Sequence, residues 1–383
     1  MHDVPLSLYV HIPWCIKKCP YCDFNSHEIQ NTLPEDQYID ALILDLTSTA
    51  QQTKDRKVKS VFIGGGTPSI FTAKSIQRLI KAINDLLELA DNVEITIEAN
   101  PGTADQKNFS GFREAGVNRI SIGVQSFVNS QLQNLGRIHD AQTAINSVQT
   151  AQQAGFENIN IDLMHALPQQ SVTTALRDVE QAINLQPTHI SYYQLTIEPN
   201  TSFYRQPPRL PDSQASWKIQ KAGMELLAQH GYQQYEVSAY AKQGFQCVHN
   251  TNYWQFGDYL GIGAGAHQKL SIDLPNAIYR CEKPKHPQQY MRSVNTKTPR
   301  HILTEEDIIF EFMLNALRLK HGFTKRQFEL HTGLSIDLID DRLQANFSEG
   351  LLIINQNRIY CSNRGYKFLD DILQSWLPEP TIT

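Results

Sequence analysis

Three cysteines near the start of the chain have the spacing of an iron–sulfur ligand set. Cys15, Cys19 and Cys22 form a C-x3-C-x2-C pattern, and no fourth cysteine follows nearby. A [4Fe–4S] cluster that is held by cysteine alone takes four thiolates. Three thiolates therefore leave one iron open, and an open iron can bind a ligand and pass it an electron.

A zinc site or a disulfide framework suits these cysteines less well. Structural zinc sites use four ligands, typically as paired C-x2-4-C knuckles, and no second knuckle follows. His11 is a conceivable fourth ligand, but it lies in a run that reads as a strand entering the cysteine loop. A disulfide framework would need an oxidising compartment and more cysteines for this length.

The composition argues against several functions. The net charge is −5 and there is no basic run, so binding of nucleic acid by a charged face is not supported. The start of the chain has no Lys or Arg before a short apolar strand, and it does not read as a signal peptide. No apolar stretch approaches the ~20 residues of a membrane span. Because the cluster needs a reducing compartment, the expected location is the cytoplasm.

Apolar, β-branched runs alternate with helix-like segments over the first 200 residues. The predicted strands are 6–12, 58–63, 94–99, 119–124, 158–163 and 189–195. The predicted helices between them are 34–52, 72–89, 104–115, 141–154 and 171–185. This alternation favours βα units and a parallel sheet. Six such units do not close an eight-stranded barrel, so the predicted fold class is α/β, with a partial, open (β/α)6 barrel.

Polar residues follow successive strands at the point where each strand ends. They are Gly64–Thr67, Glu98, Gln125, Asp162, and Thr196 with Glu198. In parallel α/β folds the carboxyl ends of the strands face one side, and the site is built there. One such group alone is often only a helix cap. Five consecutive strand ends of this kind favour a shared site.

The remainder of the chain has a different pattern. A proline-rich stretch over 206–211 cannot be regular structure and reads as a crossover. The segment 212–230 reads as a helix; the residues expected on its buried face are Trp217, Ile219, Ala222, Leu226 and Leu227. Helices over 304–319, 324–332 and 335–346 and a hairpin over 351–361 suggest a winged-helix-like unit with a packing role. The expected domains are 1–200, 201–303 and 304–383.

Nearly the whole chain resembles the anaerobic coproporphyrinogen III oxidase family of radical S-adenosylmethionine (radical SAM) proteins, and within it the HemW-like heme-chaperone branch. The run Tyr9-x-His11-x-Pro13-x-Cys15 is similar to the family signature. The resemblance implies that Cys15, Cys19 and Cys22 hold a [4Fe–4S] cluster whose open iron is chelated by S-adenosylmethionine (SAM). The SAM contacts that it implies are Tyr9, Tyr21, Gly65, Gly66, Thr67, Glu98, Gln125, Arg137 and Asp162. Arg137 suits a methionine carboxylate because a guanidinium is a planar fork for a planar anion.

Two departures from the family separate the branches. The decarboxylase carries a fourth cysteine where this chain has Phe24. It also has a long N-terminal extension that helps to enclose its substrate, whereas the signature here begins at Tyr9. Both differences favour the heme-chaperone branch over porphyrinogen decarboxylation.

A later motif points towards heme. His249-Asn250-Thr251-Asn252-Tyr253-Trp254 is similar to an HNxxYW motif of the heme-chaperone branch. Histidine is a good axial ligand for heme iron, and Tyr253 and Trp254 have rings that can stack on a porphyrin face. The alternative is that the motif shapes a pocket without supplying the ligand. Cys281 is a weaker axial candidate. The resemblance also places the glycine run 261–267 near the adenosyl site, as a close-packed wall.

The resemblance implies a heme chaperone that binds a [4Fe–4S] cluster, SAM and heme and delivers heme to acceptor proteins. The alternative is a radical enzyme, either an oxygen-independent coproporphyrinogen III oxidase or a related methyltransferase. The implied partners are heme, heme-accepting proteins and an electron donor to the cluster. The sequence leaves open whether SAM is cleaved, whether one or two SAM molecules bind, how heme is attached, and whether the chain forms a homodimer or contacts membrane-bound acceptors.

Overall fold

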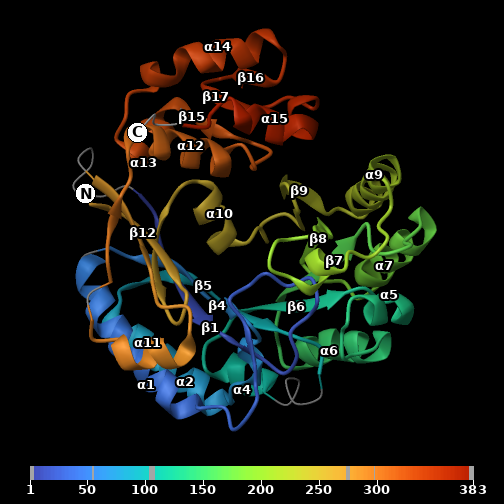
Figure 1. Ribbon diagram of the computed structural model, residues 1–383, viewed down its shortest axis with the longest axis vertical. Helices are drawn as coiled ribbons and strands as arrows, with labels where there is room; N and C mark the ends of the chain where they lie inside the picture. The colour runs from blue at the N-terminus through green and yellow to red at the C-terminus, as the bar shows by residue number, and fades with distance from the viewer. Residues whose placement is uncertain (1–3, 54–55, 103–107, 273–276, 297, 379–383) are drawn as a thin grey trace.

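Six parallel strands form the centre of the molecule (Figure 1). The computed structural model describes residues 4–53, 56–102, 108–272, 277–296 and 298–378. The central strands are β1 (Leu6–Ile12), β4 (Val58–Gly65), β5 (Leu89–Ala99), β6 (Arg119–Gln125), β7 (Asn158–His165) and β8 (His189–Gln194). Each pairs in parallel with the next. The predicted partial (β/α)6 barrel is therefore confirmed.

Helices connect these strands and cover the sheet. They are α1 (Glu35–Ala50), α2 (Ala73–Leu86), α4 (Phe109–Glu114), α5 (Asn129–Asn134), α6 (Ala141–Gln153) and α7 (Val172–Asn184). Capping explains several starts, because the side chains of Thr72, Asp140 and Ser171 accept hydrogen bonds from backbone N–H groups in the first turn. The first part of the predicted helix over 104–115 lies outside the described residues. Its described part contains α4.

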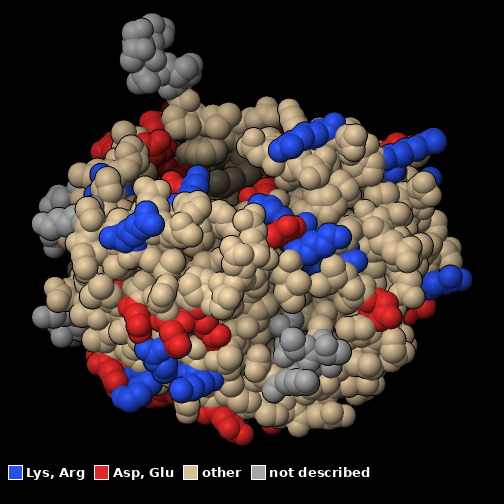
Figure 2. Space-filling model, turned by 60° about the horizontal axis from the view of Figure 1, so that its bottom comes forward, with Lys and Arg blue, Asp and Glu red and all other residues tan. Residues whose placement is uncertain are grey.

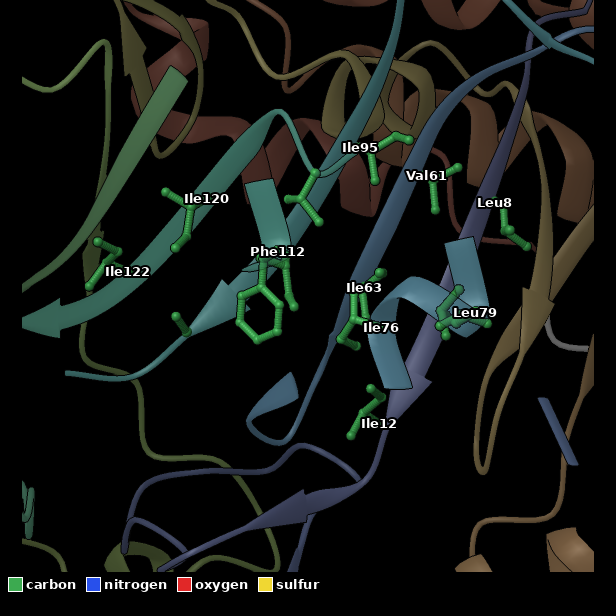
Figure 3. Packing of buried hydrophobic residues seen from close by; sticks show 14 of the residues in the cluster. Leu8, Ile12, Val61, Ile63, Ile76, Leu79, Ile95, Phe112, Ile120 and Ile122 are labelled. Carbon is green, nitrogen blue, oxygen red and sulfur yellow. The ribbon is translucent and has the colours of Figure 1, made fainter. Parts of the chain in front are cut away.

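The buried faces of these strands and helices form one large hydrophobic core. Figure 3 shows Val61, Ile63 and Ile95 on adjacent strands, facing the apolar side chains of α2 and α4. Ile76 and Leu79 lie three residues apart on α2, and both are fully buried. The helical spacing of apolar residues therefore places α2 against the sheet.

The sheet extends beyond the predicted barrel at both edges. Beside β1 lies the parallel strand β11 (Asp258–Ile262), followed by the antiparallel strands β12 (His267–Ile272), β13 (Ala277–Glu282) and β14 (His301–Ile302). Beyond β8 lie β10 (Ala239–Ala241) and β9 (Gln233–Glu236). The glycine run 261–267 joins β11 to β12. A side chain at Gly263 would collide with the His11 backbone, so this glycine lets the end of β11 lie against β1.

The helix α9 (Ser213–Gln229) corrects one prediction. Its buried residues are Ser216, Ile219, Gly223 and Leu227, whereas Trp217 is 38% exposed. A side chain at Gly223 would come within 2.5 Å of the Tyr192 ring. The lack of a side chain at Gly223 therefore determines which face of α9 packs against Tyr192. Trp217 lies about 100° away from Ser216 around the helix, and its ring lies beneath the Lys367 ammonium group.

The last part of the chain packs around a second hydrophobic core, which also includes Phe256 and Ile278. Its helices are α12 (Glu305–Ala316), α13 (Lys325–Thr332), α14 (Asp340–Ser348) and α15 (Leu369–Gln374). A small sheet contains β15 (Phe323–Thr324), β17 (Arg358–Cys361) and β16 (Leu352–Asn355). The predicted helix over 335–346 is divided into a 3-10 turn, Ile336–Ile339, and α14. Figure 1 shows this unit at one end of the barrel. The predicted domain boundaries stay a prediction.

Charged side chains of both signs lie close together on the face shown in Figure 2, which is also deeply hollowed. No extended basic patch is visible on the described part of that face. Within the described ranges, no helix combines the length and the apolar character that crossing a membrane requires.

Candidate cluster and nucleotide site

The cysteine loop is closed by a short pair of parallel strands. β2 (Trp14–Cys15) pairs with β3 (His27–Glu28), so the two ends of the loop lie side by side. Lys18 Nζ donates hydrogen bonds to the carbonyl oxygens of Phe24 (3.0 Å) and Ser26 (3.2 Å). This lysine therefore ties the middle of the loop to its returning end.

The three cysteines are free thiols and line one cavity of about 350 Å³, which we call the nucleotide cavity. Burial raises the pKa of the Cys15 and Cys22 thiols. Among the described residues, no three His, Cys, Asp or Glu side chains form a ligand set for a single metal ion. A [4Fe–4S] cluster makes a different demand, because each thiolate binds its own iron. Three unpaired thiols in one loop and one cavity fit a cluster of this kind.

The nucleotide cavity brings together most of the residues that the sequence predicted. Besides the cysteines, its lining includes Tyr21, Gly65, Gly66, Thr67, Glu98, Gln125, Arg137, Asp162, Thr196 and Glu198. Tyr9 instead lines two neighbouring cavities, of about 560 and 240 Å³, and these share Glu98 with the nucleotide cavity. The convergence follows from the parallel sheet, whose carboxyl ends meet at one edge.

The glycine turn after β4 has no room for side chains. Gly65 has φ +117°, and a Cβ there would lie 2.6 Å from the His11 ring. A Cβ on Gly66 would collide with the Trp14 carbonyl. The Gly65 N–H donates to Glu98 Oε2 at 2.9 Å. Glycine thus brings the backbone of this turn into contact with both the cysteine loop and β5.

His11 supports this turn through both of its ring nitrogens. Its Nδ1 lies 2.9 Å from the Tyr9 hydroxyl, and its Nε2 lies 2.8 Å from the Asn25 carbonyl. Burial lowers the pKa of His11. Both ring nitrogens are engaged, so His11 connects β1 to the cysteine loop.

A chain of hydrogen bonds links the glycine turn to Cys19. Asn100 Nδ2 donates to Thr67 Oγ1 at 2.7 Å, and Arg137 Nη2 donates to Asn100 Oδ1 at 2.7 Å. Arg137 Nη1 in turn lies 3.4 Å from Cys19 Sγ. Sequence reasoning missed Asn100, although it directly follows the third strand. Arg137 is therefore held in place before any anion binds.

Two carboxyl groups in the nucleotide cavity have raised pKa values. Burial raises the pKa of Glu98 to about 7; the Gly65 N–H opposes this shift and the Asp162 charge adds to it. Burial also raises the pKa of Asp162, while hydrogen bonds from Asn160 and Ser191 oppose the shift. Glu98 therefore titrates near neutral pH and can accept or release a proton close to a bound ligand.

Gln125 is held in a backbone conformation that is uncommon for its type. Its φ is +70° at the end of β6, and Tyr193 Oη donates to Gln125 Oε1 at 2.8 Å. Left-handed backbone at a non-glycine residue carries strain that often accompanies function. Tyr193, which the sequence reasoning also missed, lines the nucleotide cavity from the end of β8.

The HNxxYW motif forms a short helix, α10 (Val248–Trp254), that packs against the sheet. His249 is 1% exposed, and its Nδ1 lies 3.0 Å from Ser60 Oγ. Its Nε2 has no hydrogen-bond partner among the described residues, and the imidazole lines the 240 Å³ cavity. Burial lowers the pKa of His249 to about 3, so it stays neutral.

The other aromatic residues of the motif face different surroundings. Tyr253 lines both cavities that Tyr9 lines. Trp254 packs against the Arg318 guanidinium, whose carbon lies 4.3 Å from the ring centroid. Glu94 accepts hydrogen bonds from the backbone N–H groups of Val248 and His249, both at 3.1 Å, and this fixes the start of α10. The motif therefore contributes His249, Asn250 and Tyr253 to the walls of these cavities, whereas Trp254 packs against Arg318.

Comparisons with known proteins agree with this geometry. The radical SAM superfamily profile matches residues 9–182, and the HemN C-terminal domain profile matches residues 303–368. The heme chaperone HemW of Haemophilus influenzae is 48% identical over 379 residues, 98% of each chain. That of Escherichia coli is 46% identical over 375 residues, 98% of this chain and 99% of the relative. The structure of Escherichia coli coproporphyrinogen III oxidase (HemN) superposes with a TM-score of 0.82 at 24% identity, over 98% of this chain and 91% of that one.

Proposed function

Because the chain belongs to the HemW heme chaperone family and contains the radical SAM domain, we propose that it binds heme and delivers it to heme-accepting proteins. The observation that carries this proposal is 48% identity over 98% of both chains to a protein named heme chaperone HemW. The radical SAM domain implies that the same polypeptide holds a [4Fe–4S] cluster and SAM.

The cluster is assigned to Cys15, Cys19 and Cys22. When bound, it supplies an iron with an open coordination position for the methionine end of SAM. The reason for the assignment is that these thiols are free and line one cavity with the predicted SAM contacts. Around them, Lys18 and the β2–β3 pair hold the loop, so protein contacts help to fix the positions of the thiols.

SAM is assigned to the nucleotide cavity. Arg137 is placed for the methionine carboxylate, since its guanidinium is already oriented by Asn100 and by the Gly123 carbonyl. Glu98 is placed for the amino group beside the Gly65 turn. Asp162 and Gln125 supply oxygen atoms for ribose hydroxyls, and Tyr21 covers one side. Tyr9 acts on the SAM site indirectly, through His11 and the Gly65 turn.

Porphyrinogen decarboxylation is the competing function. The structural similarity to HemN supports a shared fold but not a shared reaction, because the sequence identity is only 24%. The decarboxylase family has a fourth cysteine where this chain has Phe24, whose side chain is 59% exposed and lines the cavities on both sides of Gly65. A phenylalanine offers no ligand or proton at this position, which supports carriage of heme over decarboxylation.

The partners follow from this function. We place the protein in the cytoplasm, because a cluster with an open iron needs reducing surroundings. Its partners are then heme, heme-accepting proteins and an electron donor to the cluster. Association into a homodimer and contact with membrane-bound acceptors stay proposals.

The test is heme binding followed by transfer. Anaerobically reconstituted protein is titrated with ferric heme, and the Soret band is followed to find the stoichiometry. The loaded protein is then mixed with an apo-hemoprotein, whose own spectrum reports transfer. One heme per chain that moves to the acceptor supports the proposal. Formation of decarboxylated product from coproporphyrinogen and SAM, without heme binding, would establish the competing function.

A further inference from the structure

The cysteine loop borders a second and larger cavity. This cavity has a volume of about 1110 Å³ and is bounded by residues 26–34, by residues 200–205 and by the start of α11 (Pro287–Ser293). It shares Cys19 and Cys22 with the nucleotide cavity, but Cys15 and the glycine turn do not line it. Pockets for drug-sized ligands typically measure about 300–1,000 Å³, so it has room for a large planar ligand beside the cluster loop. We call it the histidine cavity.

Two histidines face each other at this cavity. The rings of His27 and His286 have centroids 5.6 Å apart at an angle of 67°, and both residues line the cavity. His27 is fixed by the cysteine loop, because its backbone N–H donates to the Pro13 carbonyl at 2.7 Å. His286 is exposed and directly precedes α11, but its side chain caps no amide of that helix. The His286 imidazole therefore makes no capping hydrogen bond at the start of α11.

One ring nitrogen of this pair has no partner in the part of the chain that the structure describes. His27 Nε2 is buried and has no hydrogen-bond partner among the described residues. In the same part of the chain, no third His, Cys, Asp or Glu completes a ligand set for a bare metal ion. Heme iron makes a smaller demand, because the porphyrin supplies the equatorial ligands and the protein adds an axial one. Ligating histidines are usually oriented by a partner on the other ring nitrogen, and His27 is placed to act as that partner.

Two arginines at the histidine cavity can bind a ligand that carries two carboxylates. Arg205, at the end of α8 (Ser202–Arg205), and Arg292, on α11, both line it and are exposed. Neither forms an ion pair with another described residue. Glu28 also lines the cavity, but its Oε1 accepts a hydrogen bond from the Lys18 backbone N–H. Guanidinium groups bind carboxylates in a fork geometry, and heme carries two propionates.

The wall between these charges is partly apolar. Trp14, Ile29, Leu33 and Met291 all line the histidine cavity. Trp14 is 8% exposed and belongs to the main hydrophobic core, with which Ile29, Leu33 and Met291 also pack. The lining of the cavity is mostly polar, and these side chains add some apolar surface against which a porphyrin face can pack.

The cavity at His249 lacks this space. Its volume is about 240 Å³, below the range of about 300–1,000 Å³ for drug-sized ligands. The imidazole there is already bonded to Ser60 and lies under Phe62, with ring centroids 5.0 Å apart. The cavity beside His249 is therefore much smaller than the histidine cavity.

We propose that the histidine cavity is the heme site, in which His286 is the axial ligand, His27 orients it, and Arg205 and Arg292 hold the propionates. This inference rests on the proposed function, because it assigns a place to the heme that the protein carries.

The test compares heme titrations of reconstituted wild-type protein and variants, with electron paramagnetic resonance to report the axial ligand. His286→Ala is expected to lose the imidazole-ligated signal and to bind heme at least tenfold more weakly. The double substitution Arg205→Gln with Arg292→Gln is expected to weaken binding by ten- to a hundredfold while the imidazole signal remains. The matched controls are His301→Ala and Arg326→Gln, at exposed positions outside the cavity lining, and both should bind heme as the wild type does.

Rescue separates ligation from misfolding. In His286→Gly, added imidazole should restore the ligated spectrum if the side chain supplies the axial nitrogen. The inference is overturned if wild-type protein binds heme and His286→Ala keeps both its affinity and its spectrum. It is also overturned if His249→Ala alone abolishes the imidazole signal. If the wild-type protein binds no heme, the proposed function itself fails.

Discussion

The two cavities beside the cysteine loop differ in how their walls are built. The nucleotide cavity is formed by the ends of strands, and its polar groups already bond to one another, as Arg137 does to Asn100. The histidine cavity is formed by loops and helix ends, and its guanidinium groups form no ion pairs with other described residues. Preorganised groups bind a fixed reagent with little loss of entropy, whereas loosely held groups suit a cargo that must leave. The difference fits a protein that retains SAM and releases heme.

The largest effect is expected at the loop that both cavities share. Cys19→Ala removes one of the three proposed cluster ligands, and we expect the iron content and the visible absorbance of the cluster to fall at least fivefold, because a cubane with two thiolates is poorly held. Cys281→Ala, at a buried cysteine outside the loop, should retain both. Normal iron content in Cys19→Ala would contradict the ligand assignment.

Arg137 tests the preorganised cavity alone. Arg137→Ala should weaken SAM binding by about 2–3 kcal/mol, since hydrogen bonds between charged groups contribute about 1.5–3 kcal/mol. Equilibrium binding of SAM to the reconstituted protein measures this loss. Heme affinity should stay within a factor of about two, because Arg137 does not line the histidine cavity. Arg113→Ala, at an exposed arginine bonded to the Gly155 carbonyl, is the control.

Glu98 gives the nucleotide cavity a pH dependence. Its pKa is about 7 in the folded protein, raised mainly by burial from an ordinary value of 4.5. The folded state therefore holds a proton that the unfolded state has lost between about pH 4.5 and 7, and stability falls as pH rises through this window. Glu98→Gln should remove that fall and be more stable than the wild type at pH 8 by about 1–3 kcal/mol, as measured by denaturant unfolding at pH 5 and pH 8.

The same substitution should impair binding. If the ionised Glu98 carboxylate accepts a hydrogen bond from the amino group of SAM, the affinity of the wild-type protein for SAM should decline below pH 7. The Glu98→Gln variant should bind SAM weakly at every pH. An unchanged affinity across pH 6 to 8 in both proteins would remove Glu98 from the SAM contacts.

The smallest effect is expected at the motif helix. Ser60→Ala removes the hydroxyl that bonds His249, and a lost buried hydrogen bond costs about 1–3 kcal/mol when its partner stays buried. Thermal unfolding should show this loss, while heme affinity should not change. A fall in heme affinity of tenfold or more would return His249 to the heme site.

The sequence could predict the barrel because its signals are local. Alternation of β-branched runs with capped helices requires no knowledge of distant contacts, and the polar strand ends follow from parallel order alone. Glu98, Gln125 and Asp162 were found in this way. Asn100 and Tyr193 carry the same signal, each near a strand end, but an asparagine in a turn and a tyrosine in a strand are too common to stand out.

Other features depend on contacts that no local pattern contains. Trp217 was placed on the wrong face because the packing of α9 is decided by the fit of Gly223 against Tyr192. His27 and His286 are far apart in the chain and meet only because β11, β12 and β13 return beside β1. The small volume beside His249 likewise arises from three-dimensional packing, which no local pattern contains. The role of the motif in heme binding stays a prediction.

The most direct test of the two-site assignment is a titration of heme into reconstituted protein at increasing SAM concentrations. Two separate cavities predict one heme and one SAM on the same chain, with an apparent Kd for heme that reaches a constant value once SAM is saturating. A Kd for heme that rises in proportion to SAM concentration would show that the two ligands exclude each other, and would contradict the assignment of two sites.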